Sequence, residues 1–383
     1  MPRTIYFDYN ATTPLDPAVR DVMLPFLGEV WGNPSSVHHV GQQARAVLDD
    51  LRDRAAQLLK TKPSEIIFTS GGTESNNLAI FGTARLLAKK GRHIITSVVE
   101  HHAVLHCFDY LESREGFSVT RLPVDSSGRV SPDDLKRAFR PETTFVSIMA
   151  ANNEIGTIQP VAELGALCRE RGVIFHTDAA QWFGKEAFSD IEQFNADLVS
   201  VCAHKFHGPK GAGLLYIRSP LLPDPIFFGG GHENERRGGT ENLPAIAGLV
   251  AAMEKFVPNP VFNKHYLTPL ASRLVAAIDS ISGLFLVGSR EQRLANTVSF
   301  VVEGADSIAL MACLDLEGIC ASSGSACSAG SIEPSHVISA LEPYKNLANS
   351  LVRFSLGRDS TETEINQVIA VLPDVINHAK GAK

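Results

Sequence analysis

The stretch DLVSVCAHKFHGPKGAGLLYIR, residues 197–218, joins two apolar β-strand patterns through a turn rich in glycine and proline. No helical pattern separates the runs DLVSVC and GLLYIR, which predicts that they form neighbouring antiparallel strands. Lys205 follows the first run, and a lysine at the end of a buried strand is costly unless it has covalent or ionic work to do. The stretch alone leaves two interpretations open: a lysine that faces solvent, or an amine of lowered pKa that forms a Schiff base.

Similar apolar runs recur along the first two thirds of the chain, and amphipathic helical patterns lie between most of them. This alternation predicts an α/β fold with a mostly parallel seven-stranded sheet that helices cover on both faces. The strands are expected at EIIFTS (65–70), HIITSV (93–98), SVTRLPV (118–124), TFVSIMA (144–150), VIFHTD (173–178), DLVSVC (197–202) and GLLYIR (213–218).

The pattern changes near residues 242–262, where a long apolar helix runs into VPNPVF, and this change marks a domain junction. We expect a large α/β domain at residues 15–257 and a smaller α+β domain formed by residues 1–14 and 258–383. Thr361 and Glu364 have capping-box spacing and predict the start of the last helix. The other elements of the small domain are expected as helices at 265–281 and 307–316 and strands at 296–304 and 353–357.

Composition predicts a soluble, cytoplasmic globular protein. The formal net charge of −7 and the lack of a basic run argue against a nucleic-acid partner. No run of about 18 uncharged apolar residues occurs, so we expect no membrane span. The opening MPRTIYFDYN has neither an apolar signal core nor the character of a transit peptide. Six cysteines at irregular spacing indicate reduced thiols rather than a disulfide framework.

The segment TSGGTESNN, residues 69–77, places a double glycine between a strand and a helix. Two glycines let the backbone approach an anion closely, and the helix start directs free N–H groups and a partial positive charge at it. The alternative is a simple strand-to-helix turn capped by Thr73. The segment matches neither a Walker loop nor a GxGxxG fingerprint, so a nucleotide is the weaker ligand hypothesis.

HTDAAQ places Asp178 and Gln181 after another strand, at the sheet edge where open α/β folds bind ligands. A carboxylate that keeps a heterocyclic nitrogen protonated, together with a Schiff-base lysine, is what pyridoxal phosphate needs as an electron sink. The alternative is that Asp178 only caps the next turn. His101 in VVEHHAV follows a third strand, where an imidazole could stack on a pyridine ring or move protons.

The histidines and the cysteines are two further candidates for chemical roles. The histidines suggest a metal site, but no HExxH occurs and no cysteine pair has zinc-ligand spacing, so we expect none. Cys327 lies in the loop ASSGSACSAG with little apolar cover, which favours a reactive thiol. The cysteines on helical patterns are expected to be buried hydrophobes, and these are Cys107, Cys168 and Cys313.

Taken together, the motifs from YFDYNATTP to RFSLG resemble the cysteine desulfurases of the NifS/IscS type, which are pyridoxal-phosphate enzymes of fold type I. The resemblance covers nearly the whole chain and rests on the order and spacing of the motifs. It implies pyridoxal 5′-phosphate as cofactor, L-cysteine as substrate and a homodimer.

The resemblance also implies a role for each matching position. Lys205 would hold the cofactor as a Schiff base, Asp178 would pair with its ring nitrogen, and His101 would stack on the ring and shuttle protons. Gln181 and Asn153 would bond the ring hydroxyl of the cofactor. The cofactor phosphate would be held by Gly72, Thr73, Cys202 and His204, and the phosphate of the neighbouring subunit would be reached by Thr240. The substrate carboxylate would be bound by Asn33, Asn153 and Arg353.

Cys202 departs from the family pattern, which has a serine two residues before the histidine. A thiol is a weaker donor than a hydroxyl, so the phosphate loses one good hydrogen bond unless the backbone supplies it. The implied reaction converts L-cysteine to L-alanine: Lys205 takes the α-proton, and the Cys327 thiolate takes the sulfur as a persulfide. A protein acceptor such as an iron–sulfur scaffold would then receive it.

Other functions fit parts of the pattern. A class V aminotransferase or a selenocysteine lyase would share Lys205 and Asp178, but an aminotransferase would not need Cys327. A non-catalytic cofactor-binding or sulfur-carrier protein with a vestigial site is the alternative from a different class.

Overall fold

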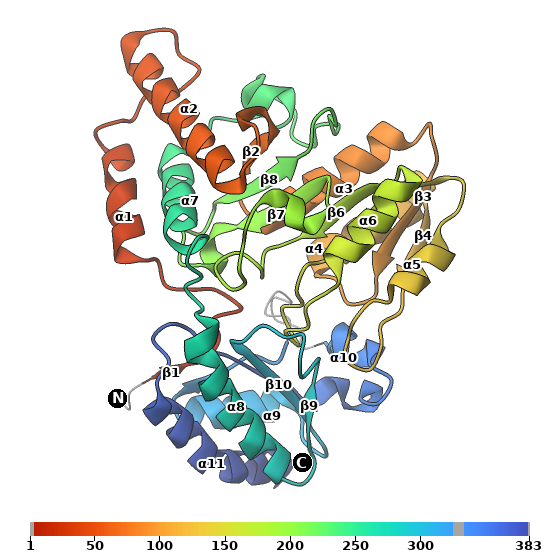
Figure 1. Cartoon of the computed structure of the whole chain (residues 1–383). Coiled ribbons are helices and arrows are strands. Elements are labelled where there is room, and N and C mark those ends of the chain that lie inside the picture. Colours follow the sequence, from red (N-terminus) through yellow and green to blue (C-terminus); the bar gives the residue numbers. More distant parts are fainter. Residues whose placement is uncertain (1–3, 325–332, 382–383) are drawn as a thin grey trace.

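A computed structural model describes residues 4–324 and 333–381 of the chain. Figure 1 shows two bodies, one above the other, with the larger sheet in the upper body and the termini in the lower one. The larger sheet has seven strands in the order β2-β8-β7-β6-β5-β3-β4. Their bounds are β2 Ile66–Thr69, β3 His93–Ser97, β4 Ser118–Leu122, β5 Thr143–Ser147, β6 Ile174–Asp178, β7 Leu198–Cys202 and β8 Gly213–Ile217.

The sheet is mostly parallel, as the alternating pattern predicted, and every predicted strand is present. Strands β4, β3, β5, β6 and β7 pair in parallel, whereas β8 pairs antiparallel with both β7 and β2. The β7–β8 register matches Leu198 with Ile217 and Cys202 with Gly213, which confirms the antiparallel return after the lysine turn. The loop that carries Lys205 therefore begins and ends at one edge of the sheet.

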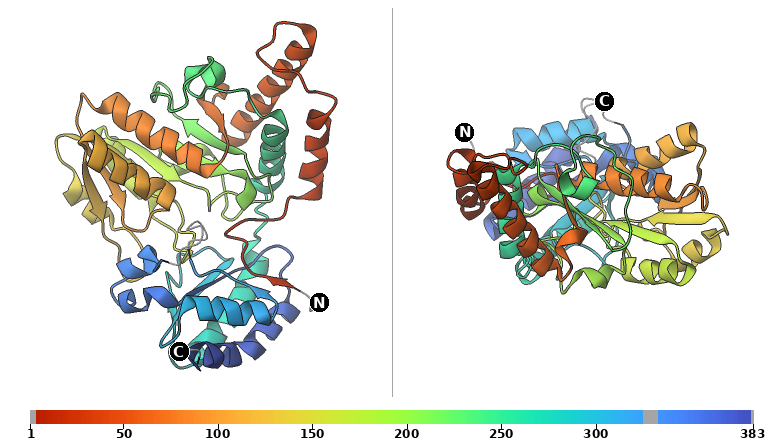
Figure 2. Two further views of the ribbon diagram at one scale, coloured as in Figure 1. Left: turned by 180° about the vertical axis from the view of Figure 1, so that it is seen from behind. Right: turned by 90° about the horizontal axis from the view of Figure 1, so that it is seen from above.

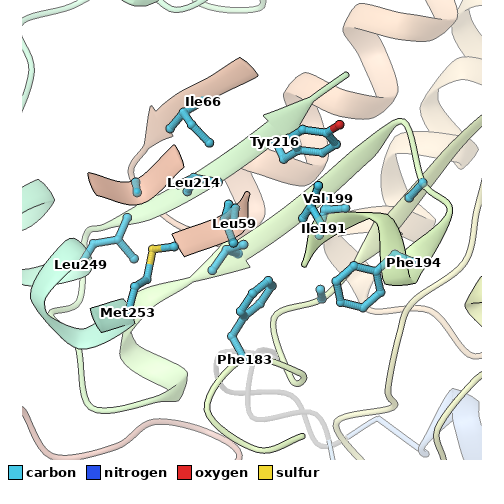
Figure 3. Close-up of a cluster of buried hydrophobic side chains, with 14 of the residues drawn as sticks. Leu59, Ile66, Phe183, Ile191, Phe194, Val199, Leu214, Tyr216, Leu249 and Met253 are labelled. Carbon is cyan, nitrogen blue, oxygen red and sulfur yellow. The ribbon is translucent and has the colours of Figure 1, made fainter. Parts of the chain in front are cut away.

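Helices cover both faces of this sheet because successive strand residues point to opposite sides. On β2, Ile66 and Phe68 belong to one buried cluster while Ile67 belongs to another. Figure 3 shows part of the first cluster, in which Leu249 and Met253 of α7 pack toward the sheet. Figure 2 shows helices on both sides of the sheet. The helices on the first face are α2 His39–Leu59, α5 Pro132–Ala138, α6 Val161–Arg171 and α7 Leu243–Phe256, and those on the other are α3 Gly72–Leu87 and α4 His102–Glu115.

The lower body packs helices against a three-stranded antiparallel sheet of order β12-β10-β9. Its helix α11 begins with the predicted capping box, in which the Thr361 amide donates to Glu364 and the Glu364 amide donates to the Thr361 hydroxyl. The N-terminal strand β1 pairs in parallel with β11. The bounds are β1 Ile5–Tyr6, α8 Lys264–Ser280, β9 Leu284–Val287, β10 Thr297–Val302, α9 Ser307–Leu316, β11 Ile319–Cys320, α10 His336–Ala340, β12 Leu351–Ser355 and α11 Glu362–Gly381.

Shorter elements connect these parts of the chain. They are α1 Pro17–Met23 and six 3₁₀ turns, at Leu24–Leu27, Pro63–Glu65, Ile191–Phe194, Ala203–Lys205, His232–Glu235 and Lys345–Ser350.

The cysteines on helices differ from one another in burial. Cys107 and Cys168 are buried, as predicted, but Cys313 is only half-buried at the edge of the lower core, so that prediction was wrong. Cys313 lies on α9, whose outer side is exposed at Leu316. Within the described ranges, no helix is long and apolar enough to cross a bilayer.

A strap at residues 227–242 lies against the start of the sheet and contains a left-handed turn. Glu233, Asn234 and Glu235 all have positive φ angles, of 50°, 55° and 65°, and such residues are individually strained. The carboxylate of Glu233 holds this turn in place. It accepts two hydrogen bonds from the buried Arg52 guanidinium, at 2.8 and 2.6 Å, and one from the Phe68 amide.

We predict that Arg52→Met lowers the free energy of unfolding by about 3–5 kcal/mol, because it leaves the Glu233 carboxylate buried without its partner. The matched control is Arg45→Met on the same helix. Arg45 pairs with Asp49 while both side chains are about half exposed, and such pairs contribute less than about 1 kcal/mol. Denaturant unfolding measures both variants. Equal losses in the two would contradict the role of the buried pair.

Candidate active site

One cavity of about 180 Å³ opens at the carboxyl ends of the parallel strands, between the two bodies. Ligands of open α/β folds bind at this edge of the sheet. The cavity brings together most of the predicted site residues, namely Gly72, Thr73, His101, Asn153, Asp178, Gln181, Cys202, His204, Lys205 and Arg353.

Asp178 is the last residue of β6, and its carboxylate is buried at the base of the cavity. Its Oδ2 accepts a 2.6 Å hydrogen bond from Asn76 on α3, and its Oδ1 accepts one from the Ala180 amide at 2.9 Å. The second bond means that Asp178 does cap the next turn, but the carboxylate also lines the cavity. A carboxylate held by two donors at the wall of a cavity can pair with a cationic ring N–H.

Lys205 projects into the same cavity from the short 3₁₀ turn that follows β7. Its Nζ donates 2.8 Å hydrogen bonds to the carbonyl oxygens of Asn10 and Ala11. These carbonyls belong to the N-terminal segment that leads from the lower body to the upper one. The lysine therefore faces the cavity rather than bulk solvent.

His101 caps α4, and the structure defines which of its nitrogens carries the proton. Its Nδ1 accepts a 3.0 Å hydrogen bond from the Ala103 amide, which leaves the hydrogen on Nε2. Burial lowers the pKa of His101 below its ordinary value, so the imidazole is neutral at pH 7. A neutral ring of this kind can cover the face of an aromatic cofactor and donate a proton through Nε2.

The start of α3 forms a cradle for an anion. Gly71 is the N-cap residue of the helix and has a φ angle of +149°, a conformation that favours glycine. No side chain caps the first turn of this helix. The alternative in which Thr73 caps the turn is therefore wrong, because Thr73 lies inside the helix. The free N–H groups of this first turn and its partial positive charge suit a phosphate.

Cys202 and His204 border this cradle from the end of β7. Burial raises the pKa of the Cys202 thiol, although the amides of Gly72 and His204 act on the sulfur in the opposite direction. Burial also lowers the pKa of His204 to about 4, so its ring is neutral. With a neutral thiol and a neutral imidazole here, the positive potential comes from the backbone N–H groups and from the nearby charge of Lys205.

Arg353 reaches the cavity from β12 of the lower body and is fully buried. Its Nη2 pairs with Asp8 at 2.6 Å, and its Nη1 donates to the carbonyl oxygens of Asn153 and Gly324 at 2.9 and 3.1 Å. Its Nε has no hydrogen-bond partner among the described residues. The guanidinium therefore keeps capacity for a carboxylate ligand.

Two predicted site residues lie away from this cavity, and a third falls outside the described residues. Asn33 is exposed in the loop before α2, where its Oδ1 accepts from the Ser35 amide, and it does not line the cavity. Thr240 lines a separate cavity on the strap, beside Arg237 and Glu233. Cys327 lies outside the described residues. The roles given to these three residues stay predictions.

The structure adds residues that the motifs did not identify. Asn76, Asn10 and Ala11 contact the predicted groups directly, and Lys185 lies behind Gln181. Asn76 lies within the TSGGTESNN segment, where its spacing from the helix start was the available signal. Within the described ranges, no group of three or more His, Cys, Asp and Glu side chains is arranged to hold a metal ion.

Glu100, next to His101, is another buried group of the site that sequence reasoning missed. Its carboxyl accepts hydrogen bonds from the Ser97 hydroxyl at 2.6 Å and from the Met149 amide at 3.0 Å. Burial raises the pKa of Glu100 to about 8. At neutral pH the Glu100 carboxyl is therefore mainly protonated. Its hydrogen bond holds the backbone of Met149, which lines the cavity.

Comparisons with known proteins agree with this geometry. The family model for class V aminotransferases matches residues 5–368. The cysteine desulfurase IscS of Dictyoglomus turgidum is 46% identical, covering 98% of this chain and 95% of its own length, and that of Methanosarcina thermophila is 44% identical, covering 98% and 92%. A solved NifS-like protein superposes with a TM-score of 0.90 at 36% identity, covering 98% of this chain and 100% of its own. The structure of SspA in complex with cysteine gives a TM-score of 0.81 at 36% identity, covering 94% and 100%.

We predict that Glu100→Gln changes how stability depends on pH. The folded-state pKa of Glu100 is raised, so wild-type stability falls as pH rises from the unfolded pKa near 4.5 to the folded value of about 8. Glutamine cannot ionise and escapes this loss of up to about 1.4 kcal/mol per pH unit. The free energy of unfolding of both proteins is measured at pH 5 and pH 8. Relative to the wild type, the variant should be more stable at pH 8 than at pH 5. A difference that does not change with pH would contradict the assignment.

Proposed function

The chain belongs to the cysteine desulfurases of the class V aminotransferase family, and on that premise we propose that it uses pyridoxal 5′-phosphate to convert L-cysteine to L-alanine. In this proposal the sulfur passes to Cys327 and then to an acceptor protein. The observation that carries the proposal is that one cavity holds the Lys205 amine, the paired Asp178 carboxylate and the Arg353 guanidinium.

The donor set of the cavity fits this cofactor. Lys205 offers the amine for covalent attachment, Asp178 a carboxylate for the ring nitrogen, and the first turn of α3 a cradle for the phosphate. Gln181 and His101 line the remaining walls, where a ring oxygen and a ring face need partners. When bound, pyridoxal phosphate supplies an electron-withdrawing ring that makes the α-proton of an amino acid acidic.

The chain's own residues then bind the substrate and move its protons. Arg353 can take the substrate carboxylate, because its Nε has no partner among the described residues and Asp8 fixes its Nη2. Lys205 is the base that takes the α-proton, and the carbonyls of Asn10 and Ala11 hold its Nζ in place. His101, which lines the same cavity and carries its hydrogen on Nε2, is the residue that we assign to return a proton.

Sulfur transfer requires a thiolate, which we assign to Cys327. The thiolate attacks the sulfur of the substrate, and a new S–S bond forms as the Cβ–S bond breaks. The carbon keeps the electron pair and is protonated to give alanine. Support comes from the described chain just before this residue, because Arg353 Nη1 donates to the carbonyl of Gly324. The chain that leads to Cys327 is thus attached to the residue that would hold the substrate.

The assembly and the destination of the sulfur are also part of the proposal. A homodimer would bring Thr240 of the strap to the neighbouring phosphate site, and Thr240 lies in an open cavity on the exposed strap. An iron–sulfur scaffold is the proposed class of acceptor. We place the enzyme in the cytoplasm, since a reducing compartment keeps its cysteines as free thiols.

We predict that L-cysteine leaves one extra sulfur on the peptide that contains Cys327, with alanine formed in parallel. Cys327→Ser should lose persulfide formation and at least about a hundredfold of the desulfurase rate, because the nucleophile is absent. Cys313→Ser, which alters a half-buried thiol far along α9, is the matched control. Mass spectrometry and an alanine assay measure the outcome. Sulfide release at the wild-type rate from Cys327→Ser would instead favour an enzyme that does not need this thiol.

We predict that Lys205→Ala abolishes the visible absorbance of the protein reconstituted with pyridoxal phosphate, since the amine that attaches the cofactor is gone. Asp178→Asn should keep the absorbance but lower turnover by about a hundredfold or more, because a neutral amide cannot keep a ring nitrogen protonated. Absorbance spectra and steady-state kinetics test both variants. Unchanged spectra in Lys205→Ala would support the non-catalytic alternative.

A further inference from the structure

Lys185 is a buried lysine that the proposed reaction does not use. It follows β6 by seven residues, and only 3% of its surface is exposed. Its Nζ donates to Asn10 Oδ1 at 2.5 Å and to Gln181 Oε1, and it lies 5.0 Å from the centre of the Phe262 ring. Burying a lysine is expensive, so an interaction that recovers this cost is expected.

The bond from Lys185 determines which way the Gln181 side chain faces. An amide has one oxygen and one NH₂ group, and Lys185 occupies the oxygen. The NH₂ group must then point away from Lys185, where it donates to the Asn10 carbonyl at 3.0 Å beside the cavity. Without Lys185, the Gln181 amide could rotate and present its oxygen to the cavity instead.

Asn10 connects this buried lysine to the cofactor lysine. Its side-chain oxygen accepts from Lys185 and from Asn296, at 2.5 and 3.0 Å, while its backbone oxygen accepts from Lys205 and Gln181. Both lysines therefore rest on one residue of the N-terminal segment. A displacement of Lys185 would therefore reach Lys205 through Asn10.

The charge state of Lys185 matches its surroundings. Burial, together with the positive charges of Lys205 and Arg353, lowers the pKa of Lys185 well below its ordinary value. The lowered pKa favours the neutral amine, whose two N–H groups match the two oxygen acceptors that the structure gives it. In that form Lys185 orients Gln181 without adding a full charge to the cavity wall.

We propose that Lys185 is a positioning residue that holds Gln181 with its NH₂ group directed at the ring oxygen of the bound cofactor. The inference rests on the proposed function, because the oxygen in question belongs to pyridoxal phosphate. An ionised ring oxygen needs hydrogen-bond donors, and an amide presents one only when its own oxygen is occupied elsewhere. Lys185 thereby tunes the cofactor without touching it.

The test removes the amine while keeping the length of the side chain. Apo protein with Lys185→Met is titrated with pyridoxal phosphate, and the visible band is then followed against pH. We expect the Kd to rise about tenfold or more, the effect of losing one hydrogen bond to a charged group. The pH midpoint of the band should rise by about one unit, because an oxygen without its donor binds a proton more readily. Lys264→Met, which removes an exposed lysine ammonium, is the control and should match the wild type.

A double-mutant cycle tests whether Lys185 acts through Gln181. The loss of affinity in Lys185→Met/Gln181→Ala should equal that of Gln181→Ala alone, since Lys185 has nothing left to orient. Additive losses would overturn the proposal and indicate an independent structural role. Lys185→Gln keeps an N–H donor in the site and should keep a midpoint near the wild-type value, and a midpoint equal to that of Lys185→Met would also overturn it.

The outcomes separate this inference from the proposed function. Wild-type protein that fails to bind pyridoxal phosphate would overturn both. Wild-type binding with an unchanged titration of Lys185→Met would overturn the role of Lys185 alone.

Discussion

The site depends on one N-terminal segment that is hydrogen-bonded to both bodies of the molecule. The Tyr9 amide donates to the Ser355 carbonyl in the lower body, and the Thr13 amide donates to the His204 carbonyl beside Lys205. Within the same segment, Asp8 pairs with Arg353 and Asn10 supports Lys205. The short stretch from Asp8 to Thr13 therefore sets the distance between the group that would hold the substrate and the base that would deprotonate it.

The regular elements could be predicted because each carries a local signal. The strands of the large sheet are runs rich in β-branched residues, and helical patterns separate most of them. The start of the last helix is predicted by the spacing of only two residues, Thr361 and Glu364. Strands β9 and β11 were not predicted. Strand β11 has only two residues, and the apolar run LFLV of β9 contains a single β-branched residue, so a helix segment could show the same pattern. Asn10, Asn76 and Lys185 escaped for another reason: a polar side chain faces inward only where distant segments supply its partners, and spacing along the chain does not record those partners.

Position 202 carries a thiol where the family resemblance leads us to expect a hydroxyl, so the proposed phosphate site would contain a weaker donor there. The amides of Gly72 and His204 both act on this sulfur, and these N–H groups come from the helix start and the lysine turn. The backbone geometry of the cradle is set by Gly71 and by the strand end, not by the side chain at position 202. The amides of the first turn of α3 would therefore remain available to the proposed phosphate with either side chain at position 202.

The antiparallel return of β8 has a mechanical consequence for turnover. Because β7 and β8 run in opposite directions, both ends of the lysine loop are fastened at the same sheet edge, where the Ala203 amide donates to the Ala212 carbonyl. The lysine that we propose as the anchor of the cofactor therefore lies on a loop whose two ends are joined by backbone pairing in the upper body. Arg353, the proposed partner of the substrate carboxylate, comes from the lower body, so a small rotation of that body would move Arg353 relative to Lys205.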